Sequence, residues 1–315
     1  AVKIEKLDIE RVLVAARAEV GSAERFVYMR KLLMEQLGLQ LGTKNDGPVD
    51  LLWRGTKRRG RVRLDNVRTL AYAASNNDFD PGSDQFLILV DYPYDETAGK
   101  TREDDLENAR QARVRGGPKW TLAWLPTHLA ASEMESLTNA AAIDLIRKEP
   151  RRFFDDLSPR EADAAARALE AYQSTRRTDL AEAIRRLYFD EGLVHGLHAR
   201  LEGVDATSLD RSRAVDVLGK LALDNRFPNH PPFTKKIGIP ELSVISDWVI
   251  RAAKTGQAVD LKSADMGLVE AVVVPVEVAF KGPSGITRRT DGRYLAPVLE
   301  WVGTRTEFEA GDLRK

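Results

Sequence analysis

Two short apolar segments constrain the fold of this 315-residue chain more than any other feature. Residues 86–90 (FLILV) and 120–125 (WTLAWL) are unbroken apolar runs, which are typical of strands buried on both faces of a parallel sheet. A charged stretch with helical character, residues 102–113, lies between them. Strand, helix and strand in this order predict a βαβ unit with a right-handed crossover.

Helices and a pair of strands are predicted before this unit. Residues 8–20 and 22–38 each begin with a good helix-capping residue and show helical spacing of apolar side chains. Two short strands, residues 49–54 and 61–64, then flank a turn that is bounded by glycines. We therefore expect residues 1–131 to form an α/β part with a partial parallel sheet.

The rest of the chain is predicted to differ from this α/β part. Residues 132–203 have helical patterns throughout, and Ser158 followed by Pro159 is a strong helix start, so we expect a helical, lid-like region. Residues 204–315 mix helical and strand patterns. Their order, three helices and then a β-hairpin, is that of a winged-helix domain.

The composition excludes several classes of protein. Lys and Arg number 48 and so do Asp and Glu, so any binding to phosphate must come from local patches. Cysteine is absent, which excludes disulfides, thiolate nucleophiles, iron–sulfur clusters and the usual structural zinc sites, and fits a cytoplasmic location. The longest apolar run, residues 271–280, is too short to span a bilayer, so no membrane partner is expected.

An acidic cluster directly follows the first apolar run. Asp91 ends that run, and Asp95 and Glu96 follow it closely. Apolar residues ending in an acid have the shape of a Walker B strand, whose Asp holds the Mg²⁺ of a bound nucleotide. Tyr92 stands where ATPases commonly have a Glu, so a water-activating carboxylate would have to be Asp95 or Glu96. These three acids are the candidate catalytic residues, and Asp91 is the candidate metal ligand. The alternative is that Asp91 only caps the turn after the strand.

A complete phosphate-binding loop is missing from this sequence. Residues 98–101 (AGKT) match the end of the G-x-x-x-x-G-K-[ST] pattern, but Tyr94 occupies the position of its first glycine. No other segment has the pattern. We therefore expect this chain by itself to lack ATP hydrolysis.

The densest group of cations lies in and around the predicted Gly-bounded turn. A group of this kind can contact the phosphates of a nucleotide or of DNA, and the flanking glycines allow a close approach. The alternative is a solvated charged face. The candidate phosphate- or DNA-binding residues are Arg54, Lys57, Arg58, Arg59 and Arg61.

Four strings in one order resemble a known family. They are WRGTKRRG at residues 53–60, DYPYDE at 91–96, AWLP at 123–126 and RFPNHP at 226–231. Together they are similar to the central region of the large PglY/BrxC-type ATPases of the bacterial phage growth limitation and BREX defence systems.

The resemblance implies a function that the residues alone do not. It implies a multidomain P-loop ATPase that binds ATP and Mg²⁺, with its Walker A loop upstream of Ala1 and with Asp91 as the Walker B-like acid. The resemblance implies that DNA and other phage-defence proteins are partners, and it leaves the oligomeric state open.

Three hypotheses follow from these observations. The leading one is a fragment of a phage-resistance ATPase that completes a nucleotide site and contacts DNA or defence partners. The second is a non-catalytic scaffold that binds DNA or a partner. The third is a metal-dependent nuclease that uses Asp91, Asp95, Glu96 and Asp104. The surroundings of Asp91 discriminate between them, because an ATPase needs an open carboxylate, a nuclease needs converging carboxylates, and a scaffold needs Asp91 bonded within a turn.

Overall fold

The computed structural model describes residues 2–69, 85–97, 99–117 and 120–227, together with isolated positions between 230 and 271. The chain divides into two units. The first contains Ala1–Val49 and Arg59–Arg226, and the second contains Asp50–Arg58 and Phe227–Lys315. The expected winged-helix part falls mostly outside the described residues.

A β-hairpin opens the sheet and differs from the predicted pair of strands. β1 (Asp46–Trp53) and β2 (Thr56–Leu64) are joined by only two residues, Arg54 and Gly55. Their φ angles of 43° and 73° are those of a primed turn, whose twist matches that of the flanking strands. The prediction of a longer, glycine-bounded turn over residues 55–60 was therefore wrong. Most of the basic residues assigned to that turn lie on strand β2.

The sheet contains six strands in chain order, β1 to β6. The four that follow the hairpin are β3 (Leu87–Val90), β4 (Thr121–Leu125), β5 (Leu193–Gly196) and β6 (Val204–Asp205). β2, β3 and β4 run parallel, with Leu64 opposite Val90 and Val90 opposite Trp124. β5 and β6 are added in antiparallel pairing. The fold is thus α/β with a mixed sheet.

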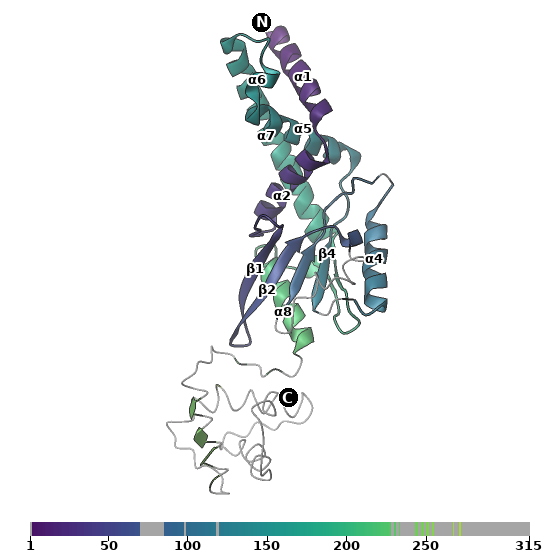
Figure 1. The fold of residues 1–315 in the computed structure, drawn as a ribbon, viewed down its shortest axis with the longest axis vertical. Helices are drawn as coiled ribbons and strands as arrows, with labels where there is room; N and C mark the ends of the chain where they lie inside the picture. The colour runs from purple at the N-terminus through teal and green to yellow at the C-terminus, as the bar shows by residue number, and fades with distance from the viewer. Residues whose placement is uncertain are drawn as a thin grey trace. The chain divides into compact units, whose positions relative to one another are not determined.

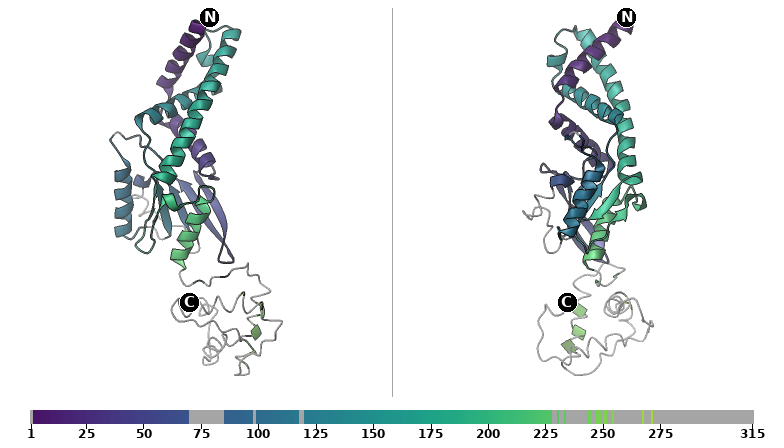
Figure 2. Two further views of the ribbon diagram at one scale, coloured as in Figure 1. Left: turned by 180° about the vertical axis from the view of Figure 1, so that it is seen from behind. Right: turned by 90° about the vertical axis from the view of Figure 1, so that its right-hand side faces the viewer.

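The predicted βαβ unit is confirmed. α4 (Arg102–Val114) connects the two parallel strands β3 and β4, which are fully buried. Its Ala109 packs with Leu87, Leu89 and Ala123 in one apolar cluster, so α4 covers the sheet face to which these side chains point. α8 (Ala214–Arg226) contacts the same two strands, and Figures 1 and 2 show it on the other side of the sheet. The short helix η1 (Val67–Thr69) lies between β2 and β3 in the chain.

Helices from two parts of the chain pack together beside the sheet. The two N-terminal helices contact both long helices of the segment between β4 and β5 (Figure 1). The helices are α1 (Val2–Glu19), α2 (Ser22–Gln36), α5 (Ala131–Lys148), α6 (Pro150–Phe153), α7 (Pro159–Arg185) and the π-helical turn η2 (Arg186–Asp190). The predicted start of α7 is confirmed, because Ser158 caps it through the Glu161 N–H.

The prediction that residues 132–203 are helical throughout was wrong. Helical structure ends at Asp190, and the chain returns to the sheet as strand β5. Gly196 allows a close crossing there, since a Cβ at this position would lie 1.7 Å from the Leu201 carbonyl oxygen. Among the described helices, none combines the length and the apolar composition needed to cross a membrane.

Candidate functional site at the end of strand β3

Asp91 lies at the carboxyl end of β3, as predicted, but its carboxylate is enclosed. The residue is only 1% exposed. Its Oδ1 accepts hydrogen bonds from two backbone N–H groups, that of Val67 at 3.1 Å and that of Tyr92 at 3.0 Å. The hydroxyl of Tyr188, which is fully buried, donates to the backbone oxygen of Asp91. Asp91 therefore joins the end of β3 to η1 and η2.

The electrostatic environment of Asp91 disfavours its charge. Burial raises the pKa of this carboxyl well above the ordinary value of 3.8, and the negative charge of Asp105 raises it further. The two backbone donors and Arg68 oppose this shift. A raised pKa makes a carboxyl a weaker ligand for a hard cation, because Mg²⁺ binds the ionised oxygen and must compete with the proton.

Asp95 and Glu96 each have an arginine partner. Asp95 forms an ion pair with Arg68, and its Oδ1 also accepts a bond from the backbone N–H of Thr97 at 2.6 Å. Glu96 binds the guanidinium of Arg25 through both oxygens, at 3.0 and 2.5 Å. This bidentate contact connects the segment after β3 to helix α2. Neither carboxylate converges with Asp91 on a common ligand.

A buried ionic network, which sequence reasoning did not identify, lies beside Asp91. Arg68 Nε lies 2.7 Å from Asp105 Oδ1, and His128 Nε2 lies 2.9 Å from Asp105 Oδ2. Asp105 is 1% exposed, although it belongs to a helix whose other acids face solvent. The network links η1, α4 and the loop before α5. Nothing in the sequence pairs residues so far apart, so only the position of Asp105 on the inner face of α4 could have suggested it.

We tested whether these residues fit the Mg²⁺ that the family resemblance implies. Within the described ranges, no group of three or more His, Asp or Glu side chains is arranged to hold a metal ion. Both N–H contacts of Asp91 occupy the same oxygen, and the group is sealed from solvent. The site as built does not fit a magnesium ligand. Asp104 is used elsewhere, since its carboxylate accepts the Thr101 N–H that starts α4.

Two of the predicted phosphate-binding arginines lie against aromatic rings of the second unit. The guanidinium of Arg58 lies 5.6 Å from the ring of Trp53 and 5.2 Å from that of Phe227. Arg54 lies 5.0 Å from the Trp53 ring and donates to the His230 carbonyl oxygen at 2.6 Å. The His230 ring in turn packs on Trp53, with centroids 4.5 Å apart.

The other three predicted phosphate-binding residues project differently. Lys57 and Arg59 are exposed, and Arg61 is half-buried. Because alternate residues of a strand point to the same face, Lys57, Arg59 and Arg61 share one face of β2. Arg61 forms a loose ion pair with Asp46, at 3.9 Å.

The fold and these contacts define a mixed α/β domain with a closed acidic strand end and a helical segment inserted before β5. The model of the PglY fourth domain matches residues 12–216, well over half of the chain, and the chain therefore belongs to the PglY family of phage-defence proteins. This confirms the resemblance to PglY/BrxC-type proteins. No solved structure matches the chain.

Proposed function

We propose that this chain is a non-catalytic module of a phage-defence ATPase, which supports neighbouring parts of the protein instead of supplying ligands to the nucleotide. The observation that carries the proposal is the enclosure of Asp91. A Walker B-like acid must face an open site, whereas this one is 1% exposed and bonded to two backbone N–H groups. Its geometry is that of a turn-capping residue.

The order of the strands supports the same conclusion. Open α/β sheets bind ligands where the strand order reverses and two loops diverge to leave a crevice. The described strands follow one another from β1 to β6 in chain order, so within them there is no reversal beside β3. The end of β3 is covered by η1 and by Tyr188 of η2.

Manganese, a paramagnetic substitute for magnesium, tests this proposal on the chain itself. We expect Mn²⁺ with ATP to cause no saturable broadening of the amide resonances of Val67 and Tyr92, because the Asp91 carboxyl beside them is enclosed and already accepts both of their N–H groups. Asp104→Asn serves as the matched control, since Asp104 is an exposed capping carboxylate nearby. Broadening of the two amides that disappears in Asp91→Asn would instead assign Asp91 to a metal site.

The nuclease alternative gains no support from the contacts of its carboxylates. Asp95 and Glu96 are paired with arginines, Asp91 is enclosed, and Asp104 caps a helix. Within the described residues, these carboxylates do not form the converging group that a metal-dependent nuclease needs.

A second candidate function is a contact with DNA, and the exposure of Lys57 and Arg59 favours it. Both lie on one face of β2, and alternate residues of a strand are about 6.6–6.8 Å apart. Cations in such a row can follow a phosphate backbone without reading its sequence. Arg54 and Arg58, by contrast, contact aromatic rings and are assigned to the packing of the second unit.

Fluorescence anisotropy with a labelled duplex tests this second candidate. We expect weak binding, about micromolar at physiological salt, because the net charge of the chain is zero. Changing Lys57 and Arg59 together to Ala should weaken binding to all sequences and flatten the slope of log affinity against log salt by about two. The matched control is the double change of Arg54 and Arg58 to Ala. Absence of any binding at low salt would refute the DNA contact.

A further inference from the structure

A polar cleft lies where the three helices α2, α5 and α7 meet, each of which contacts the other two. Its volume is about 230 Å³, which is below the range of ordinary small-molecule sites and suits a single side chain. The charged side chains of its lining are three cations and two acids, namely Lys31, Arg147, Arg177, Asp144 and Glu170.

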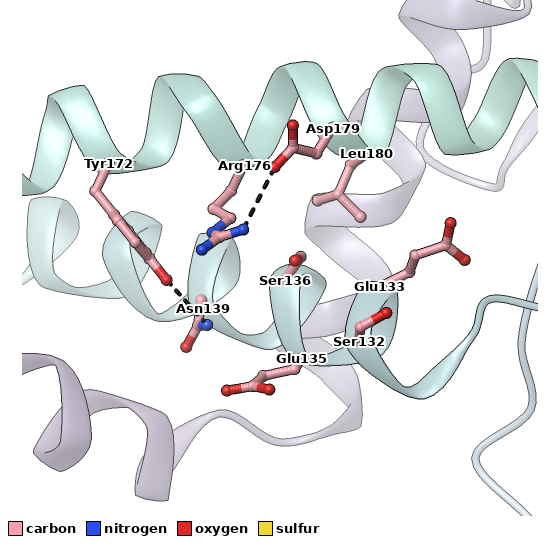
Figure 3. Close-up of a pocket in the computed structure, with 9 residues that line it drawn as sticks. All are labelled: Ser132, Glu133, Glu135, Ser136, Asn139, Tyr172, Arg176, Asp179 and Leu180. Atoms are coloured by element: carbon pink, nitrogen blue, oxygen red, sulfur yellow. Dashed lines mark hydrogen bonds and ion pairs between the residues drawn. The ribbon is translucent and has the colours of Figure 1, made fainter.

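A second cleft, which is lined by α5 and α7 alone, provides a contrast (Figure 3). Each of its three carboxylates already contacts an arginine: Glu133 binds Arg186, Glu135 binds Arg17, and Asp179 binds Arg176. The charges of that second cleft are therefore largely compensated within the chain, and the three-helix cleft is the one with charge to offer.

Tyr28 contributes an unpaired hydroxyl to the lining of the three-helix cleft. The residue is only 5% exposed, yet its hydroxyl is not sealed from solvent and forms no hydrogen bond with any described residue. Charged residues of the cleft act on this hydroxyl: burial raises the pKa of Tyr28, Arg177 opposes that shift, and Asp144 adds to it. A hydroxyl held in a buried position without an acceptor is unfavourable, so Tyr28 offers a donor to a group that enters the cleft.

A buried glutamine positions one of the cations. Gln173 is 8% exposed, and its Nε2 donates to the backbone oxygen of Ala140 at 3.1 Å. This bond leaves Oε1 to accept a hydrogen bond from Arg147 Nη1 at 3.3 Å. Among the described residues, no carboxylate pairs with Arg147. Because Gln173 is neutral, it orients the guanidinium of Arg147 without compensating its charge.

The balance of charge in the three-helix cleft favours a monovalent anion. Lys31, like Arg147, has no carboxylate partner within the described part of the chain. Asp144 contacts Lys148 at 3.6 Å, and Arg177 binds Glu35 of α2. Three cations against two acids leave the lining with a net charge of +1, which one carboxylate neutralises. The two acids repel a phosphate dianion more strongly than a group with a single charge.

We propose that the three-helix cleft binds a carboxylate group, as presented by a glutamate or aspartate side chain of a partner protein. The guanidinium of Arg147 can donate N–H groups to both oxygens of a carboxylate, and the Tyr28 hydroxyl can donate to one of them. Lys31 adds a second positive charge, and the buried side chain of Leu32 offers an apolar wall to the methylene groups of the entering residue. The site goes beyond the proposed scaffold function because it assigns the chemistry of a partner.

NMR titration of the 315-residue chain with N-acetyl-glutamate methylamide tests this proposal. We expect saturable shifts of the amides of Tyr28, Arg147 and their neighbours at the cleft, with a dissociation constant of about 1 mM at low salt, because one side chain buries little surface. N-acetyl-glutamine methylamide has the same shape without the charge and should bind at least about tenfold more weakly. Inorganic phosphate should also bind more weakly, because Asp144 and Glu170 repel its second charge.

Two variants and one control locate the binding. Tyr28→Phe removes only a hydroxyl that has no partner among the described residues, so the melting temperature should not fall, whereas binding of the glutamate derivative should weaken about tenfold. Arg147→Gln removes the two-donor contact with the carboxylate and should weaken binding by about tenfold or more. Arg160→Gln is the matched control, because Arg160 is an exposed cation in the first turn of α7 outside the lining, and it should change the affinity by less than about twofold.

Several outcomes would overturn the proposal. Failure of the wild-type chain to bind the glutamate derivative would remove the site, and this measurement does not depend on the folding of any variant. Equal binding of the glutamine derivative would show that the cleft does not recognise the charge. Tighter binding of phosphate at the same amides would assign the cleft to a phosphate group instead, and full affinity in Tyr28→Phe would show that the unpaired hydroxyl has no part in binding.

Discussion

Replacing Asp91 by Ala should destabilise the fold much more than replacing it by Asn. In Asp91→Ala the backbone N–H groups of Val67 and Tyr92 lose their common acceptor in a buried position. An unsatisfied buried group costs roughly 1–3 kcal/mol, so for two such groups we expect a loss of about 2–6 kcal/mol in the free energy of unfolding. Asp91→Asn keeps an oxygen for both donors and removes the repulsion from Asp105, so we expect a change of less than about 1 kcal/mol.

The pH dependence gives the same comparison an internal check. The pKa of Asp91 is raised in the folded state by burial, so ionisation opposes folding. Such a group leaves stability intact below its unfolded pKa, and stability is lost as the pH rises through the folded pKa. We therefore expect the free energy of unfolding of Asp91→Asn to increase relative to that of the wild type as the pH rises from about 4 upward.

Urea denaturation followed by tryptophan fluorescence and circular dichroism measures these differences. The result that would refute the reasoning is a loss in Asp91→Asn as large as that in Asp91→Ala. It would mean that the charge of Asp91, and not its role as an acceptor in the turn, stabilises the end of β3. An Asp91→Asn advantage that shrinks with rising pH would contradict the direction of the pKa shift.

Two further predictions concern the sheet and the helical segment. Gly60→Ala would place a Cβ about 2.4 Å from the buried ring of Phe86. The free energy of unfolding should therefore fall by about 1–3 kcal/mol, which thermal unfolding measures. An unchanged melting temperature would show that the ring can move at no cost. Ser158→Ala removes the side-chain cap of α7 and should reduce the free energy of unfolding in urea by about 1 kcal/mol, whereas Ser158→Asp should preserve it.

The central strands could be predicted from the sequence because burial on both faces leaves a continuous apolar run. Within the two apolar runs, residues 87–90 and 121–125 form strands, and α4 lies between these strands in the chain. Strand β5 could not be predicted in this way. It contributes only four residues to the sheet, includes a histidine, and follows directly after a long helix, so its place depends on pairing with β4 and not on its own sequence.

The sequence predicted where the candidate site lies but not whether its carboxylates are open to a ligand. The sequence places Asp91 at a strand end, which is correct, but the openness of that end depends on distant residues. Val67 supplies a donor from η1, and Arg25 and Arg68 neutralise the carboxylates that follow β3. These partners come from elements that a local motif does not include, so the pattern of a Walker B strand arises here without an open carboxylate.

The place of the helical segment in the chain order of the sheet affects how such a domain can change during evolution. The segment leaves the sheet after β4 and returns at β5, which is the neighbour of β4, so its ends are held together by strand pairing. Its length can therefore change without disturbing the register of the strands. Its contacts with α1 and α2 impose a different limit, because loss of α5 and α7 would expose the apolar faces of two helices far earlier in the chain. The four long helices are therefore expected to be gained or lost together.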